Sequence, residues 1–361
     1  MASTLVAILL ALPVGYFLFP RLRQWIRYYL PLGKPSLPPP TEIVSLRIYP
    51  VKSCRGIQVQ QTQLLAQGLD LDRRWMFVDA TTLEFLTIRQ IPEMTLINTA
   101  LSPDSSTLTL SIAGPSTTTT TTTPIEIPPR PDQSWLDANT TLATGVKIWD
   151  SSTDGYLYNA NLTAPFSSFL GRPVRLVYKG PTPRIAQGNG APHLLGRSQP
   201  VNFPDVHPVL IASESSLADL NARLADPIPI ERFRPNIVVR GGAPWSEDEW
   251  KLVRLVGSAD STTGNPTSND RGRGRGSGQS LEIDIVARCA RCQVPNVDAD
   301  SARKHPAQPW NALVSYRRVD EGIKWKPCFG MLGAPREEGV IAVGMRLEVL
   351  ALGKHKYIKG F

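Results

Sequence analysis

The sequence predicts a β-rich protein of mixed α+β class, with β-barrel or β-sandwich architecture and a few added helices. Short apolar runs that alternate with polar residues recur along the chain. Proline is frequent, at 33 of 361 residues, which favours loops and short strands over long helices. One segment shows clear helical periodicity. A chain of this length can hold two domains, and a hydrophobic content of 42% is sufficient for a sizeable core.

The first predicted element is an apolar helix at the N-terminus. Residues 3–20 carry no charged side chain, and 18 residues is close to the lower limit of about 17 for a membrane-spanning helix. Arg21, Arg23 and Arg27 follow it, and such positive charge marks the cytosolic side of a membrane. We therefore expect an uncleaved membrane anchor with its basic flank over residues 1–30, and a cytosol-facing remainder. A secretory signal and an organelle presequence are the alternatives.

The predicted strands begin after a proline-rich linker at residues 31–41. We assign residues 42–180 to a first folded domain and residues 181–355 to a second. The helix between the strands starts near Ser213, a favourable N-cap, and carries leucines at positions 217, 220 and 224 on one face. Strands are predicted at the alternating or apolar runs 44–48, 75–78, 108–112, 237–240, 252–256, 281–287 and 346–351.

Two low-complexity inserts interrupt these strands. Residues 117–123 are seven consecutive threonines, and residues 262–280 include alternating arginine and glycine at 271–276. Such a run can bind RNA, but a single short run between strands is typical of a surface loop. Because no nucleic-acid module is present, we expect no nucleic-acid partner. The net charge of +8 reflects either a solvated basic surface or attraction to phosphate or an acidic partner.

Residues 289–292, Cys-Ala-Arg-Cys, form the most informative motif. They hold two of the four cysteines, next to Arg288, at the end of a predicted strand. Neighbouring positive charge favours the thiolate, which is the reactive and metal-binding form of cysteine. A thiolate suits zinc, copper(I), iron–sulfur clusters and, by the same softness, molybdenum. A four-cysteine zinc site would need a second close pair, which Cys54 and Cys328 do not supply.

Three further segments carry groups suited to an anionic ligand. Lys52 and Ser53 lie in a turn after the first strand, where charge and hydroxyl suit phosphate, although an ordinary polar turn is the simpler interpretation. Arg73 opens the next strand within an arginine pair. Arg234 and Asn236 are two residues apart, so on an extended segment they would share one face. The sequence shows no glycine-rich dinucleotide motif and no paired histidines typical of a metal site.

Taken in order, these motifs resemble those of MOSC-domain proteins, and most closely the mitochondrial amidoxime-reducing component family. The similarity spans roughly residues 42–352. It implies an N-terminal MOSC-type β-barrel domain followed by a MOSC β-barrel domain, behind the N-terminal membrane anchor helix. Each motif is weak alone, and their specificity lies in the set, which consists of residues 46–54, 72–75, 213–221, 233–237, 289–292 and 329–330.

The resemblance also implies a cofactor and an activity. The cofactor would be the molybdenum cofactor (Mo-molybdopterin), a pterin dithiolene that carries a phosphate, with Cys292 as catalytic residue and molybdenum ligand. The residues implied to bind the rest of the cofactor are Lys52, Ser53, Arg73, Arg234 and Asn236. No role is implied for Cys289.

The implied protein is a molybdenum oxidoreductase that reduces N-hydroxylated compounds such as amidoximes and hydroxylamines. Its electrons would come from a b-type cytochrome and an NADH-dependent cytochrome reductase, and its location would be the mitochondrial outer membrane. The alternative is a sulfur carrier or molybdenum-cofactor carrier, similar to the MOSC domain at the end of molybdenum-cofactor sulfurases.

Overall fold

The computed structural model describes residues 36–114, 124–257 and 280–360. From Pro39 onward these residues belong to one compact unit, and only residues 36–38 of the separate unit Met1–Pro38 are described. The predicted anchor helix, the threonine run and nearly all of the arginine–glycine insert therefore lie outside the described residues. Within the described ranges, no helix has both the length and the apolar character that crossing a membrane requires.

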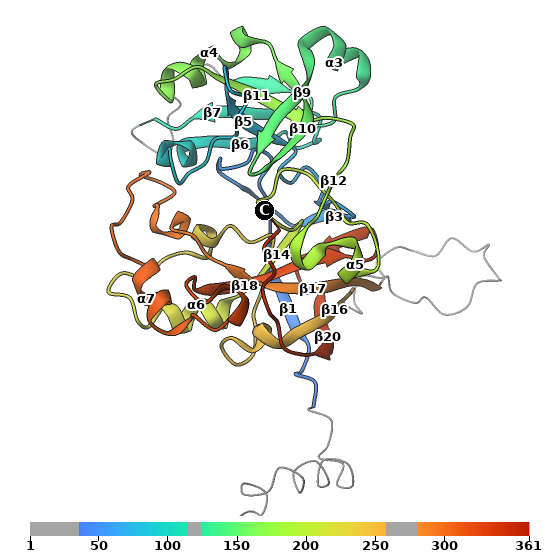
Figure 1. The fold of residues 1–361 in the computed structure, drawn as a ribbon, viewed down its shortest axis with the longest axis vertical. Helices are drawn as coiled ribbons and strands as arrows, with labels where there is room; N and C mark the ends of the chain where they lie inside the picture. The colour runs from blue at the N-terminus through green and yellow to red at the C-terminus, as the bar shows by residue number, and fades with distance from the viewer. Residues whose placement is uncertain (1–35, 115–123, 258–279, 361) are drawn as a thin grey trace, which may run out of the picture. The chain divides into compact units, whose positions relative to one another are not determined.

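The largest element among the described residues is a closed β-barrel (Figure 1). Neighbouring barrel strands are antiparallel, except that β14 and β15 run parallel, and β1 closes the barrel by pairing with β15. A hairpin adds β2 (Ile57–Val59) to β1. The order around the barrel is β15 (Ile237–Val239), β14 (Val209–Ser213), β18 (Cys328–Pro335), β17 (Ser280–Ala290), β16 (Trp250–Val256), β20 (Arg346–Leu352) and β1 (Thr41–Ile48). The predicted β-rich barrel class is confirmed.

The remaining strands form smaller antiparallel sheets. The four-stranded sheet has the order β5 (Trp75–Asp79), β11 (Val174–Lys179), β10 (Ser151–Tyr158) and β9 (Thr140–Ile148). Two three-stranded sheets comprise β6 (Ile97–Leu101), β7 (Leu108–Ile112) and β8 (Ile125–Ile127), and β19 (Gly339–Ala342), β3 (Gln61–Leu65) and β4 (Gly68–Leu69). A two-stranded sheet pairs β12 (Arg184–Ile185) with β13 (Pro200–Val201).

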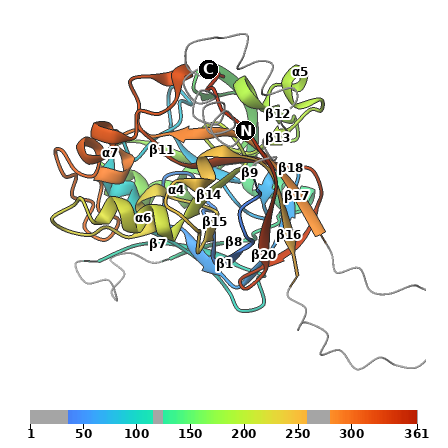
Figure 2. The same cartoon turned by 90° about the horizontal axis from the view of Figure 1, so that it is seen from below.

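The helices are short. Figures 1 and 2 place α6 and α7 side by side next to the barrel, where Leu220 and Leu313 belong to one buried cluster. The α-helices are α3 (Gln133–Asn139), α4 (Ala160–Phe169), α5 (Pro192–Leu195), α6 (Glu214–Asn221) and α7 (Trp310–Tyr316). The 3₁₀ helices are η1 (Pro92–Leu96), η2 (Gly188–Gly190), η3 (Ile230–Phe233), η4 (Ser246–Glu249), η5 (Val294–Asn296) and η6 (Glu321–Ile323).

Burial patterns explain why these segments form strands. In β7, Leu108, Leu110 and Ile112 are buried and the two residues between them are half-buried, as the alternating sequence predicts. The apolar run that opens β5 is buried on both faces, and so is all of β18. One hydrophobic cluster includes residues of the barrel and of the four-stranded sheet, so the two share a core.

Three details of the predicted elements differ in the structure. Helix α6 does occupy the predicted segment, but it ends at Asn221, so Leu224 packs against the cluster from beyond the helix. Ser213 is the N-cap residue, yet its hydroxyl hydrogen-bonds the Ser215 hydroxyl at 2.7 Å rather than a helix N–H. Strand β17 is also longer than predicted and extends through Ala290, which places Cys289 in the strand.

Candidate active site

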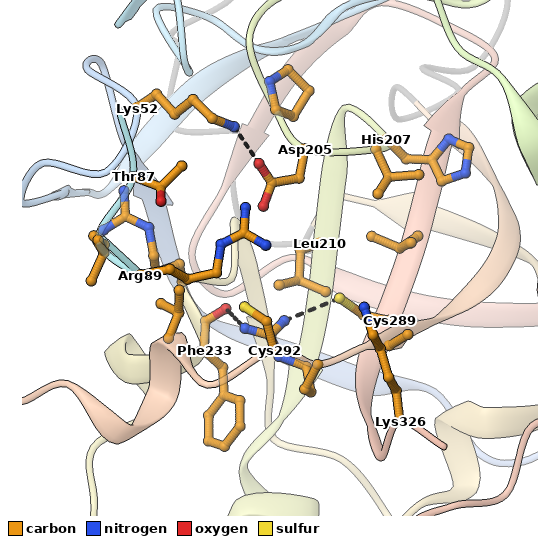
Figure 3. Close-up of a pocket in the computed structure, with 18 of the residues that line it drawn as sticks. Lys52, Thr87, Arg89, Asp205, His207, Leu210, Phe233, Cys289, Cys292 and Lys326 are labelled. Atoms are coloured by element: carbon orange, nitrogen blue, oxygen red, sulfur yellow. Dashed lines mark hydrogen bonds and ion pairs between the residues drawn. The ribbon is translucent and has the colours of Figure 1, made fainter. Parts of the chain in front are cut away.

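One cavity of about 470 Å³ brings together all six residues predicted for the site. They come from four separate stretches of the fold: the turn after β1, the entry to β5, the segment before β15 and the residues just after β17. Figure 3 shows Lys52 and Asp205 on one side of this cavity and the two cysteines of the Cys-Ala-Arg-Cys motif on the other. The predicted residues that line it are Lys52, Ser53, Arg73, Arg234, Asn236 and Cys292.

The cysteine motif is held by the end of β17 and by Arg291. The register between β17 and β18 shifts between Arg288 and Ala290, a bulge of the kind that redirects side chains near active sites. The buried Arg291 guanidinium donates to Cys289 Sγ at 3.0 Å and to the carbonyl oxygen of Phe233 at 3.0 Å. Burial raises the pKa of Cys289, and Arg291 offsets part of that increase. Cys289 is therefore a neutral thiol at pH 7.

Cys292 differs from the other cysteines. Cys289 and Cys292 are both partly exposed and line the cavity, whereas Cys54 and Cys328 are buried, and all four are free thiols. Burial raises the pKa of Cys54, and raises that of Cys328 to about 12, so neither buried thiol ionises at neutral pH. Of the two cavity cysteines, Cys289 receives a hydrogen bond from Arg291, whereas Cys292 receives none from the described residues.

The turn after β1 contributes a buried ammonium group. Lys52 Nζ donates to the carbonyl oxygen of Phe203 at 2.9 Å and forms an ion pair with Asp205. Burial lowers the pKa of Lys52 to about 8, and Asp205 limits the decrease, so the side chain is mostly charged at pH 7. Burial opposes ionisation of Asp205, but Lys52 lowers its pKa to about 2. Ser53 adopts a positive φ of 71° at the tip of this turn, beside the cavity.

Arg73 is fixed by a network that includes Asn236. Its guanidinium donates to Asp72, to Asn236 Oδ1 at 3.1 Å and to the carbonyl oxygen of Arg234 at 3.2 Å. The Asn236 amide also donates to Asp72 Oδ1 at 3.0 Å and accepts from the Leu210 N–H at 3.1 Å. The second N–H of the Asn236 amide donates to the Arg47 carbonyl oxygen at 3.2 Å. All four hydrogen-bonding positions of this side chain are therefore occupied. Asn236 therefore lines the cavity with its amide fully bonded to protein groups, one of which is Arg73.

Arg234 reaches the cavity by a route that the sequence did not predict. The segment before β15 is not extended, because η3 ends at Phe233 and Arg234 adopts a left-handed φ of 57°. The Arg234 guanidinium donates to the carbonyl oxygen of Cys54 at 2.8 Å and stacks 4.2 Å from the Tyr49 ring centroid. Burial lowers its pKa to about 10, yet it stays charged at pH 7. Its buried Nη2 has no hydrogen-bond partner among the described residues.

Several cavity residues were not identified from the sequence. Arg89 stacks on the Trp149 ring, 4.3 Å from the centroid, and its guanidinium makes no hydrogen bond or ion pair with the described residues. His207 is 4% exposed, and burial lowers its pKa to about 4, so it is neutral at pH 7. Asp205 is the counter-ion of Lys52. Isolated titratable residues of this kind form no motif that is visible in the sequence. Only the folded chain brings them to the site.

The cavity suits an anionic ligand held beside a thiol. Of the described residues that line it, seven are lysine or arginine and one, Asp205, is acidic. A buried donor without a partner costs about 1–3 kcal/mol, so the unpaired Arg234 Nη2 indicates a position that an acceptor group fills. The described residues contain no group of three or more His, Cys, Asp or Glu side chains suited to a metal ion. The donor set fits a phosphate-bearing cofactor that gains one thiolate from the protein.

Comparisons with known proteins agree with this architecture. A family model described as the MOSC N-terminal beta barrel domain matches residues 41–173, and the MOSC domain model matches residues 198–348. Human mitochondrial amidoxime-reducing component 1 is 30% identical over 311 residues, which is 84% of this chain and 81% of that protein. The chain belongs to the MOSC-domain family. In this MOSC protein, Lys52, Ser53 and Arg73 fall in the first matched range, and the other three predicted site residues fall in the second.

Further matches include a second amidoxime-reducing component and a molybdenum cofactor sulfurase. Mouse mitochondrial amidoxime-reducing component 1 is 29% identical over 84% of this chain and 80% of that protein. The molybdenum cofactor sulfurase of Oryza sativa is 28% identical over 80% of this chain, but the match spans 32% of the sulfurase. A solved structure, the YUAD protein from Bacillus subtilis, aligns with 86% of this chain and 95% of that chain, at a TM-score of 0.35 and 12% identity.

Proposed function

We propose that this MOSC protein is a molybdenum-cofactor-dependent oxidoreductase that reduces N-hydroxylated compounds such as amidoximes and hydroxylamines. The observation that carries the proposal is that the accessible thiol of Cys292 shares one cavity with a cation-rich wall. The relatives named amidoxime-reducing component support the reaction class, because the match covers most of both chains.

The roles of the residues follow from their positions. Cys292 would bind molybdenum, and Lys52, Ser53, Arg73 and Arg234 would hold the pterin phosphate. When bound, the cofactor supplies the two-electron chemistry that removes oxygen from nitrogen. The protein contributes charge and rigidity. Lys52 and Arg234 stay charged at pH 7 despite burial, and Asn236 fixes Arg73 through its saturated amide. Arg291 ties Cys289 to Phe233 and so stabilises the loop that presents Cys292.

The electron source and the location extend the same proposal. We infer that a b-type cytochrome and an NADH-dependent cytochrome reductase supply the electrons. The proposed location is the mitochondrial outer membrane, with an N-terminal anchor and the catalytic domain facing the cytosol. Relatives named as mitochondrial components and the apolar, uncharged residues 3–20 support this location.

Metal analysis and turnover test the proposal together. Full-length protein from a host that makes the cofactor should contain molybdenum and pterin, and should reduce benzamidoxime with reduced methyl viologen. Cys292→Ser should lose both the metal and the activity. Cys289→Ser is the matched control and should retain molybdenum, because Cys289 is a neutral thiol and the serine hydroxyl can still accept the hydrogen bond from Arg291. Wild-type protein without molybdenum, or Cys292→Ser with full activity, would contradict the proposal.

A second candidate function is transfer of sulfur or of the cofactor itself. The observation that favours it is the similarity to molybdenum cofactor sulfurase over 80% of this chain. In this case a cysteine of the motif would carry a persulfide, so cyanide treatment of the purified protein should release thiocyanate. Release of thiocyanate without benzamidoxime reduction would favour the carrier over the reductase.

A further inference from the structure

Two segments that are distant in the sequence form one surface beside the cavity. Residues 318–326 and 354–360 are joined by a hydrogen bond of 2.7 Å from the Tyr357 N–H to Asp320 Oδ1. A Cβ atom on Gly322 would lie 2.0 Å from the Tyr357 carbonyl oxygen, so the two backbones are in close contact. Arg288 Nη1 bonds both segments, at 3.2 Å to Asp320 Oδ2 and 3.1 Å to the His355 carbonyl oxygen. These contacts make the pair, here called the basic rim, a single rigid surface.

The basic rim carries a concentrated positive charge. Its two acidic residues are not equivalent, because Asp320 is buried and bonded to Arg288, which leaves Glu321 as the exposed acid within these two segments. The exposed cations of the rim are Arg318, Lys324, Lys326, Lys354, Lys356 and Lys359. A surface with this imbalance attracts and orients an acidic partner.

An exposed tryptophan lies within this charge. Trp325 is 79% exposed, and the Arg318 guanidinium lies 6.0 Å from its ring centroid. Ile358 in the other segment is 44% exposed. Tryptophan is enriched among the residues that dominate protein–protein binding energy. The rim therefore combines apolar and charged groups as a protein interface does.

The rim also forms part of the cavity wall. Ile323 and Lys326 from one segment, and Tyr357 and Lys359 from the other, line the cavity that contains Cys292. Figure 3 shows Lys326 beside Cys289. A protein bound to the rim would thus lie close to the site proposed for the redox chemistry.

From these observations we infer that the basic rim docks an electron-carrying protein with an acidic face. The inference rests on the proposed function. Cleavage of each N–O bond consumes two electrons and two protons, as in R–NH–OH + 2 e⁻ + 2 H⁺ → R–NH₂ + H₂O. A one-electron carrier must therefore bind and leave twice per substrate. Weak, salt-sensitive docking beside the cavity meets that requirement, whereas a bilayer held on the rim would cover the cavity that substrates enter.

The test uses full-length holoenzyme and the soluble haem domain of a b-type cytochrome. The rim variants are Trp325→Ala and the double reversal Lys324→Glu/Lys356→Glu, none of whose positions lines the cavity. The matched control is Arg240→Glu/Arg346→Glu, which makes the same charge change at side chains 62% and 58% exposed. Two readouts are compared: affinity for the oxidised haem domain by calorimetry, and benzamidoxime turnover with either the reduced haem domain or reduced methyl viologen.

Rim reversal should weaken haem-domain binding at least about tenfold at low salt, and the difference should shrink at high salt as charges are screened. Turnover with methyl viologen should not fall, because the dye is cationic and needs no protein interface. Equal effects of rim and control variants, unchanged haem-domain binding, or equal loss with both donors would overturn the inference. Loss of binding to phosphatidylserine vesicles with unchanged haem-domain affinity would instead assign the rim to a membrane. If wild-type protein fails with methyl viologen, the proposed function fails, while the binding measurement still decides the docking.

Discussion

Removal of the Asn236 side chain tests how the cavity is built. Asn236 is 1% exposed, and its amide makes four hydrogen bonds to protein groups. Two of them involve Asp72 and Arg73, so the amide links a buried carboxylate to a cavity cation. Asn236→Ala would leave several of these buried groups without partners. If Asn236 acts by holding Arg73, the cofactor-free protein must lose stability as well as cofactor affinity.

The size of the effect follows from the bonds that are lost. A hydrogen bond contributes about 0.5–1.5 kcal/mol, and a stranded buried group costs about 1–3 kcal/mol. Allowing for water entering the space, we expect Asn236→Ala to lower the free energy of unfolding by about 3–5 kcal/mol. Asn221→Ala is the matched control, because that amide makes two hydrogen bonds to the Ile228 backbone at a half-buried position. The control should lose about 1–2 kcal/mol.

Urea unfolding of the cofactor-free protein, followed by tryptophan fluorescence, measures these differences. Cofactor retention is measured separately, as the molybdenum content after gel filtration. Both stability and retention should fall in Asn236→Ala, and only stability, by the smaller amount, in Asn221→Ala. A cofactor-free Asn236→Ala protein within about 0.5 kcal/mol of wild type that fails to retain molybdenum would refute the reasoning, since it would make Asn236 a direct cofactor ligand.

Three further predictions concern single charged groups. Burial raises the pKa of Glu247 from 4.5 to about 7, so between these pH values the folded state keeps a proton that the unfolded state releases. The free energy of unfolding therefore falls by about 3 kcal/mol as pH rises from 4.5 through 7. Glu247→Gln should flatten that pH dependence in urea unfolding, and an unchanged slope would contradict it. The pKa of Lys52 is about 8, so above pH 8 the binding of inorganic phosphate to the cofactor-free protein should be accompanied by uptake of a proton. Calorimetry in two buffers measures this uptake, and Lys52→Met should abolish it. Arg234→Met removes a buried charge and the unpaired Nη2 donor, but it also removes the hydrogen bond to the Cys54 carbonyl oxygen and the stacking on Tyr49. Because these effects oppose each other, cofactor-free stability should fall by only about 1 kcal/mol, while molybdenum retention falls at least tenfold. A large loss of stability would show that the guanidinium is mainly structural.

The strands of this fold were predictable because their burial is periodic, but the closure of the barrel was not. Residues in β7 and β17 alternate between buried and half-buried positions, and that alternation is visible in the sequence. The pairing that closes the barrel joins Ile43 to Val239, and no local pattern encodes a contact between residues so far apart. The same limit applies to Arg234. The sequence predicted that Arg234 lies on an extended segment. In the structure a 3₁₀ turn ends just before it, and its own left-handed backbone directs the side chain to the cavity.

Sequence patterns also could not distinguish the environments of Cys289 and Cys292, because the two residues are of the same type. The motif at 289–292 identified a pair of cysteines, and adjacent arginines suggested that both would be reactive thiolates. In the structure the arginine is already committed, because Arg291 bonds Cys289 and the Phe233 carbonyl oxygen while burial raises the Cys289 pKa. Cys292 lies beyond the end of β17, partly exposed to the cavity. The asymmetry therefore arises from where the strand ends. If that reasoning is correct, Arg291→Lys, which keeps the charge but loses the two-pronged contact, should reduce molybdenum retention through Cys292 although Arg291 itself binds no metal; retention equal to that of wild type would show that charge alone positions the loop.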